Sequence, residues 1–149
     1  MLVKAIQFMQ SAIRVLRKEG QHPDTPTIIL TASTGKAAVN IGGTTLHTAF
    51  SLPCRKSGES NNYQRPPPQT LNTLRMKYSI LKIIVIDEIS MIGGETLSNL
   101  NQTLQHIFEC DKPFGNISIL AVGDLLHLNP VGDRPIYKNS PKIDLISLS

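Results

Sequence analysis

The stretch Lys82-Ile-Ile-Val-Ile-Asp87, with Glu88 directly after it, decides the fold of this 149-residue chain. Its four consecutive β-branched residues favour a strand. Because these residues are all apolar, the run predicts a strand that is buried on both faces, as in a parallel sheet covered by helices. The two carboxylates at its end stand where ligands bind in such sheets.

Two other apolar runs, Thr27–Ala32 and Ile117–Val122, are also predicted to be strands. Helices are predicted before and after them, at 2–16, 33–41, 70–78 and 94–107. Strands that alternate with helices predict an α/β fold, with a parallel sheet, right-handed crossovers and helices on both faces. Residues 52–69 contain four prolines and no periodicity, so we expect a surface loop or insertion there.

Charge is divided unevenly along the chain. Residues 1–82 carry a net charge of +8, and residues 83–149 a net charge of −4. This division suits a protein that follows a polyanion with one half and handles a cation with the other, although solvated faces of an ordinary domain explain it equally well. No apolar run approaches the ~20 residues of a membrane helix and no secretory signal is present, so we expect a soluble intracellular protein without a membrane partner.

Asp87 and Glu88 have the form of a Walker B element, an apolar strand that ends in Asp-Glu. In that element the first carboxylate holds Mg²⁺, and the second polarises the water that attacks a γ-phosphate. An exposed acidic pair without a ligand is the alternative for these two residues.

Thr34-Gly35-Lys36 does not complete the phosphate-binding pattern G-x-x-x-x-G-K-[ST]. That pattern requires Gly at position 30 and Ser or Thr at position 37, and the chain has Leu30 and Ala37. Amides at the start of a helix, with Lys36 nearby, still suit a phosphate of a nucleic-acid backbone. A plain capped helix is the alternative.

Two histidines belong to the same regions. His47 lies among small and apolar residues, where a hydrogen-bonded core histidine is the more ordinary role. His127 follows Asp124 by three positions, on the face predicted to hold the site, which favours contact with a phosphate.

Three blocks of the sequence together resemble the first-domain motifs of Pif-type DNA helicases, relatives of RecD in superfamily 1 that include the copies carried by Helitron transposons. The blocks are Thr31-Ala-Ser-Thr-Gly-Lys-Ala-Ala38 with Gly43-Thr-Thr-Leu-His-Thr-Ala-Phe50, Ile86-Asp-Glu-Ile-Ser-Met91, and Val122-Gly-Asp-Leu-Leu-His-Leu-Asn-Pro-Val131 with Arg134-Pro-Ile-Tyr137. They follow the order of the family and span residues 28–137.

The resemblance implies a RecA-like P-loop NTPase domain, whose relatives hydrolyse ATP with Mg²⁺ and move 5′ to 3′ along single-stranded DNA. It implies that Asp87 is the Mg²⁺-associated carboxylate and that Glu88 activates water. Asp124 opens the family motif that couples the γ-phosphate to the DNA site, and the usual glutamine of that motif falls at His127, so both are assigned to the nucleotide side.

The resemblance also implies a DNA side. Thr34, Lys36 and His47 lie in the blocks that line the DNA-strand channel in the family. The implied partners are single-stranded DNA or DNA forks.

The sequence departs from the family pattern at three places. The Walker A loop is absent, and Leu2–Ile6 looks like the helix that follows it, so the chain is expected to begin just after the phosphate cradle. His127 and Asn129 replace the usual Gln and Pro, and imidazole lacks the fixed donor and acceptor of an amide. The resemblance implies a second RecA-like domain with an arginine finger, and the chain is expected to stop before it, at Ser149. We therefore expect residues 1–149 to form part of one RecA-like domain and to be inactive alone.

The missing P-loop strand has a consequence for folding. In this fold that strand lies beside the strand at Ile117–Val122, which is therefore expected to have an unpaired apolar edge. Marginal stability or self-association of the chain follows from such an edge.

The resulting hypothesis is part of an ATP-dependent 5′-to-3′ DNA helicase of genome maintenance, serving repair, recombination or telomeres. One alternative is a DNA-binding remnant of a mobile-element helicase that uses no ATP. Another is a metal-dependent nuclease built on Asp87, Glu88 and Asp124. A nuclear location is expected, and a basic, acid-poor first helix leaves a mitochondrial transit peptide open.

Overall fold

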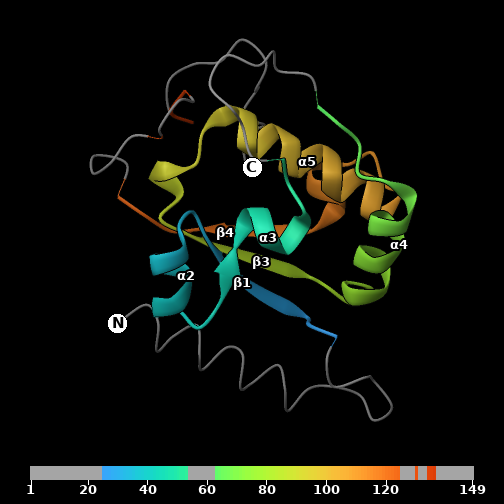
Figure 1. The fold of residues 1–149 in the computed structure, drawn as a ribbon, viewed down its shortest axis with the longest axis horizontal. Coiled ribbons are helices and arrows are strands. Elements are labelled where there is room, and N and C mark those ends of the chain that lie inside the picture. Colours follow the sequence, from blue (N-terminus) through green and yellow to red (C-terminus); the bar gives the residue numbers. More distant parts are fainter. Residues whose placement is uncertain (1–24, 54–62, 125–129, 131–133, 137–149) are drawn as a thin grey trace.

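A parallel four-stranded sheet forms the centre of the protein. The computed structural model describes residues 25–53, 63–124, 130 and 134–136. The strands run in the order β2-β1-β3-β4, and every neighbouring pair is parallel. Their bounds are β1 (Ile28–Ala32), β2 (Thr44–Thr45), β3 (Ile83–Asp87) and β4 (Ser118–Ala121). Figure 1 labels β1, β3 and β4. This arrangement confirms the predicted α/β fold with its parallel sheet.

Two of the predicted helices are confirmed closely. Thr34 caps α2 (Gly35–Asn40), and its hydroxyl accepts a hydrogen bond from the N–H of Ala37. α5 (Gly94–Phe108) begins at Gly94, the residue at which the predicted helix starts. The helix predicted at 2–16 lies outside the described residues.

α4 (Pro68–Lys77) begins two residues earlier than the predicted Thr70. Proline fits the first turn of a helix, where its missing N–H would have no partner within the helix. The loop predicted over 52–69 is therefore too long at its end, and its middle, residues 54–62, lies outside the described residues.

The sequence pattern did not predict four short elements. These are β2, α3 (Leu46–Phe50), and the short 3-10 helices η1 (Ile89–Met91) and η2 (Pro113–Asn116). Elements of two to five residues are too short to establish a period, so only the structure reveals them.

Helices cover both faces of the sheet, as Figure 1 shows, with α3, α4 and α5 on one face and α2 on the other. Alternate residues of β3 point to opposite faces. Ile84 and Ile86 pack into the larger core with the three helices, while Val85 packs with α2 into the smaller one. All three side chains are at most 1% exposed, which explains why the β3 sequence is apolar without interruption.

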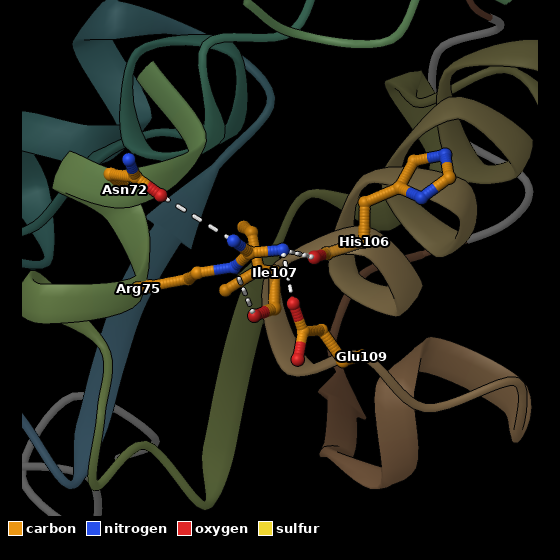
Figure 2. Close-up of polar contacts among 5 residues, drawn as sticks. All are labelled: Asn72, Arg75, His106, Ile107 and Glu109. Carbon is orange, nitrogen blue, oxygen red and sulfur yellow. Dashed lines mark hydrogen bonds and ion pairs between the residues drawn. The ribbon is translucent and has the colours of Figure 1, made fainter. Parts of the chain in front are cut away.

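Arg75 fastens α4 to the end of α5, as Figure 2 shows. Its guanidinium donates to the carbonyl oxygens of His106 at 2.9 Å and Ile107 at 3.2 Å. It also pairs with Glu109 at 2.8 Å. Carbonyls in the last turn of a helix have no partner within the helix, so Arg75 satisfies two of these acceptors of α5.

β4 is the edge strand of the sheet in the part of the chain that the structure describes. Ser118, Leu120 and Ala121 are exposed, and the exposed fraction of Leu120 is 40%. The predicted self-association through this strand stays a prediction. Within the described ranges, no helix is long and apolar enough to cross a membrane.

Candidate functional site

The strands end at the same level, which places the three sequence blocks side by side. Ala32 pairs with Thr45 and with Asp87, and Ile86 pairs with Ala121. The segments that follow β1, β2, β3 and β4 therefore leave the same edge of the sheet. We call this side of the sheet, where all four strands end, the carboxyl edge.

Backbone hydrogen bonds continue past the strand ends and fix the carboxyl edge. The N–H of Ser33 donates to the carbonyl of Asp87 at 3.3 Å, and the N–H of Ile89 donates to the carbonyl of Val122 at 3.0 Å. The backbone on both sides of Glu88 is thus tied to the two neighbouring strands.

Glu88 itself has a left-handed backbone conformation, with φ 53° and ψ 46°. This conformation is uncommon for a residue with a side chain and clusters at functional sites. Gly123 passes close to the same turn. A Cβ atom at Gly123 would lie 2.9 Å from the nitrogen of Ile89, so only glycine fits there without a shift.

The carboxylate of Glu88 meets two hydroxyl groups from the end of β1. Ser33 Oγ donates to Glu88 Oε2 at 3.3 Å, and Thr34 Oγ1 donates to the same oxygen at 3.4 Å. Both distances are long for hydrogen bonds between oxygen atoms. The structure therefore brings Glu88, the predicted water-activating residue, into contact with Thr34, a predicted DNA-binding residue.

Thr34 and Lys36 belong to the start of α2. The side chain of Thr34 is half-buried because it both caps the helix and faces Glu88, whereas Lys36 is exposed. Lys36 is therefore free to meet a solvent-borne anion, while the hydroxyl of Thr34 is already engaged.

His47 lies in the first turn of α3, which follows β2 directly. Thr45 caps α3 by accepting a hydrogen bond from the N–H of Thr48 at 3.2 Å. Burial lowers the pKa of His47, so its imidazole is neutral near pH 7 and offers one N–H donor. His47 is half-buried, and it shares the carboxyl edge with Lys36.

Tyr78 holds α3 through a hydrogen bond and a ring contact. Its hydroxyl donates to the carbonyl of Ala49 at 2.8 Å, and its ring packs against Phe50 with 5.2 Å between centroids. Burial raises the pKa of Tyr78 to about 12, so the phenol stays protonated and keeps this bond at every ordinary pH.

The two remaining acidic candidates occupy different environments. Asp87 ends β3 and is half-buried, whereas Asp124 follows β4 and is exposed. His127 lies outside the described residues. Within those residues, no three acidic, histidine or cysteine side chains come close enough together to hold a metal ion. The three-carboxylate centre of the nuclease alternative is therefore not formed by Asp87, Glu88 and Asp124.

This donor set fits Mg²⁺ held by one protein carboxylate. Magnesium keeps several waters and is bound in nucleotide sites through one or two carboxylates plus phosphate oxygens. Asp87 provides such a carboxylate on a rigid strand end, and Glu88 stands next to it.

Three residues that support the site were not singled out as site residues in the sequence. Ser33 holds Glu88, Gly123 leaves room for its turn, and Tyr78 supports α3. Ser33 and Gly123 could have been recognised as site residues from their positions, because each directly follows a predicted strand. Nothing in the sequence pattern links Tyr78 to α3.

The family model for PIF1-like helicases matches residues 7–145 of the chain. The chain belongs to the PIF1-like helicase family. Among curated proteins it is 36% identical over 108 residues to the ATP-dependent DNA helicase RRM3 of Saccharomyces cerevisiae, which is 72% of this chain and 15% of RRM3. The chain thus spans about one seventh of the length of that relative.

Solved structures of Pif1 also match this chain. Unliganded Pif1 from Bacteroides sp. matches with a TM-score of 0.60 and 30% identity, over 84% of this chain and 26% of that protein. Bacteroides Pif1 bound to single-stranded DNA matches with a TM-score of 0.58 at 30% identity, over 84% of this chain and 27% of that protein. A complex of Bacteroides Pif1 with ADP-AlF4 matches with a TM-score of 0.54 at 31% identity, over 80% of this chain and 26% of that protein. The RecA-like fold expected from the resemblance is confirmed by these neighbours.

Proposed function

We propose that this chain contributes the Walker B and DNA-facing part of the first RecA-like domain of an ATP-dependent 5′-to-3′ DNA helicase. One observation carries the proposal. The described parts of the three helicase blocks meet at one edge of a parallel sheet, where the Asp87-Glu88 pair lies against the segment Ser33–Lys36. Relatives with these blocks are named ATP-dependent DNA helicases.

On the nucleotide side, Asp87 would hold Mg²⁺ and Glu88 would orient and polarise the attacking water. Bound ATP with Mg²⁺ supplies the phosphoryl bond whose hydrolysis drives movement. The fixed backbone of Glu88 supports this role, because a base that moves with its backbone cannot hold water at one position.

On the DNA side, Lys36 and His47 would meet the backbone of a single strand. A lysine contributes a charge that attracts phosphates without reading their sequence, and a neutral histidine contributes a hydrogen bond. The structure of Bacteroides Pif1 bound to single-stranded DNA supports single-stranded DNA as the partner.

The proposal extends to the biological setting. A DNA helicase of this kind would act in genome maintenance, including repair, recombination or telomere maintenance, and would be located in the nucleus, with the mitochondrion as the alternative. Imaging of the tagged protein tests the location.

The test uses a chimaera, because the chain spans 26% of Bacteroides Pif1. The matching segment of that helicase is replaced by this chain, and DNA-stimulated ATP hydrolysis and fork unwinding are measured. We expect both activities in the chimaera, and Glu88→Gln should lower ATP hydrolysis by about 100-fold or more while DNA binding is retained. Asp111→Asn is the matched control, because Asp111 is an exposed carboxylate that does not belong to the carboxyl edge. This substitution should change neither activity.

Two results would contradict the proposal. One is ATP hydrolysis that Glu88→Gln leaves unchanged, since the pair would then not be a Walker B element. The other is a chimaera that binds single-stranded DNA and shows no ATP hydrolysis, which favours the DNA-binding alternative that uses no nucleotide.

A further inference from the structure

The hydroxyls of Ser33 and Thr34 lie between Glu88, on the proposed nucleotide side of the site, and Lys36, on the proposed DNA side. They come directly after β1, they donate to Glu88 Oε2, and they precede Lys36 by three and two positions.

The hydrogen-bonding capacity of Thr34 is limited. A hydroxyl has one proton to donate and two lone pairs. The oxygen of Thr34 already accepts from the N–H of Ala37 at 3.2 Å, and its proton is directed to Glu88. Thr34 therefore cannot donate to Glu88 and to a DNA phosphate at the same time.

The contact with Glu88 is suited to exchange. The two bonds are 3.3 and 3.4 Å long, beyond the usual 2.7–2.8 Å of hydrogen bonds between oxygens. Both converge on one carboxylate oxygen, while the backbone of Glu88 is tied down on either side. Only the side chain of Glu88 has to move when these bonds break.

We propose that Ser33 and Thr34 are positioning residues that hold the Glu88 carboxylate while no DNA is bound, and that a strand phosphate competes for their hydroxyls and releases Glu88. This inference rests on the proposed function and deepens it, because it names the contact through which DNA binding reaches the water-activating carboxylate. The free carboxylate is then available to accept a proton from water.

The chain offers a matched control for Thr34. Thr45 also caps a helix at the carboxyl edge, with the same 3.2 Å bond from a backbone N–H, but its hydroxyl donates to Thr48 at 2.8 Å and not to a carboxylate. Thr34→Val and Thr45→Val each remove one capping hydroxyl, and only the first removes a bond to Glu88. Thr34→Ser keeps the hydroxyl.

The experiment follows the side-chain carboxylate carbon of Glu88 by NMR in the full chain labelled with 13C-glutamate, assigned with Glu88→Gln. In the free chain, we expect this resonance to shift in Thr34→Val and to keep its position in Thr34→Ser and Thr45→Val. An oligothymidylate of about 10 nucleotides should shift the wild-type resonance towards its position in Thr34→Val, and should shift it little further in that variant.

Affinity for the same oligothymidylate gives a second readout. Glu88→Gln should strengthen binding by about threefold, because the competing acceptor is weakened, and in the background of Thr34→Val the gain should fall to the modest electrostatic effect of removing one negative charge. Asp87→Asn removes the same charge one residue away without touching the hydroxyls. It should give the same modest electrostatic gain in both backgrounds.

The possible failures are distinguishable. A chain that binds the oligothymidylate with the Glu88 resonance unchanged overturns this inference and leaves the proposed function standing. Equal shifts in Thr34→Val and Thr45→Val also overturn it, since loss of a cap would explain both. A chain that binds no oligothymidylate overturns the DNA-binding part of the proposed function, and this inference with it.

Discussion

Two polar clusters of this protein differ in how tightly they are held. Around Arg75, three bonds of 2.8, 2.9 and 3.2 Å join α4 to the end of α5. Around Glu88, two bonds of 3.3 and 3.4 Å join its carboxylate to Ser33 and Thr34. The contacts of Arg75 hold α4 and α5 together. The contacts of Glu88 leave its carboxylate able to change hydrogen-bond partners.

The difference lies in the side chains and not in the backbone. The backbone of Glu88 is held by the strands on both sides through the bonds at Ser33 and Ile89. A loosely held carboxylate on a firmly held backbone can respond to a ligand without a change of fold. This division of roles is what we expect of a site that must act repeatedly.

The largest expected effect comes from breaking the tight cluster. Arg75→Ala should lower the free energy of unfolding by about 2–3 kcal/mol, because two carbonyl acceptors at the end of α5 lose a charged donor. Urea denaturation of the full chain measures the change.

Glu109→Gln is the control for that prediction. It removes the ion pair of Arg75 with a carboxylate that is 74% exposed, and it should cost less than about 1 kcal/mol. Equal losses for Arg75→Ala and Glu109→Gln would show that the ion pair, and not the carbonyl contacts, holds the two helices together.

A smaller effect is expected from crowding the turn of Glu88. Gly123→Ala should lower the free energy of unfolding by about 1–2 kcal/mol, because the added Cβ would lie 2.9 Å from the nitrogen of Ile89. Gly35→Ala is the control, since nothing lies within 4 Å of its added Cβ, and it should be neutral or stabilising. If Gly123→Ala and Gly35→Ala have the same effect on the free energy of unfolding, the backbone around Glu88 is not firmly held, and the contrast between the two clusters fails.

The smallest effect is the pH dependence contributed by His47. Because burial lowers the pKa of His47 in the folded state, the unfolded chain binds this proton more readily. The contribution to stability is complete above the ordinary pKa of 6.5 and is lost as the pH falls through the lowered pKa. Urea midpoints between pH 8 and pH 5 should therefore decline less in His47→Gln than in the wild type. A wild-type midpoint that rises on acidification relative to the variant would contradict the assignment.

Long elements with a clear period could be predicted from the sequence. The apolar run of β3 and the leucines of α5 each carry a local signal, and each is found where the sequence predicted it. β2 and α3 were missed because two to five residues establish no period.

Contacts between distant residues could be predicted only in outline. Alternation of strands and helices implied that Asp87 and Thr34 reach one edge, but not that Thr34 bonds Glu88 across 54 positions of sequence. That contact depends on the register of β1 against β3, which many side chains fix together. The contacts of Arg75 with α5, 31 and 32 positions away, depend on helix packing in the same way.

The affinity of the full chain for single-stranded DNA tests the central claim most directly, with Lys36→Ala compared against Lys82→Ala over a salt series. Lys36 lies at the carboxyl edge and Lys82 at the opposite end of β3, and both are exposed. We predict salt-sensitive binding that Lys36→Ala weakens, with a slope of log affinity against log salt reduced by about 0.7, while Lys82→Ala leaves it unchanged. Equal effects of the two substitutions, or binding that salt does not weaken, would contradict a DNA-binding carboxyl edge.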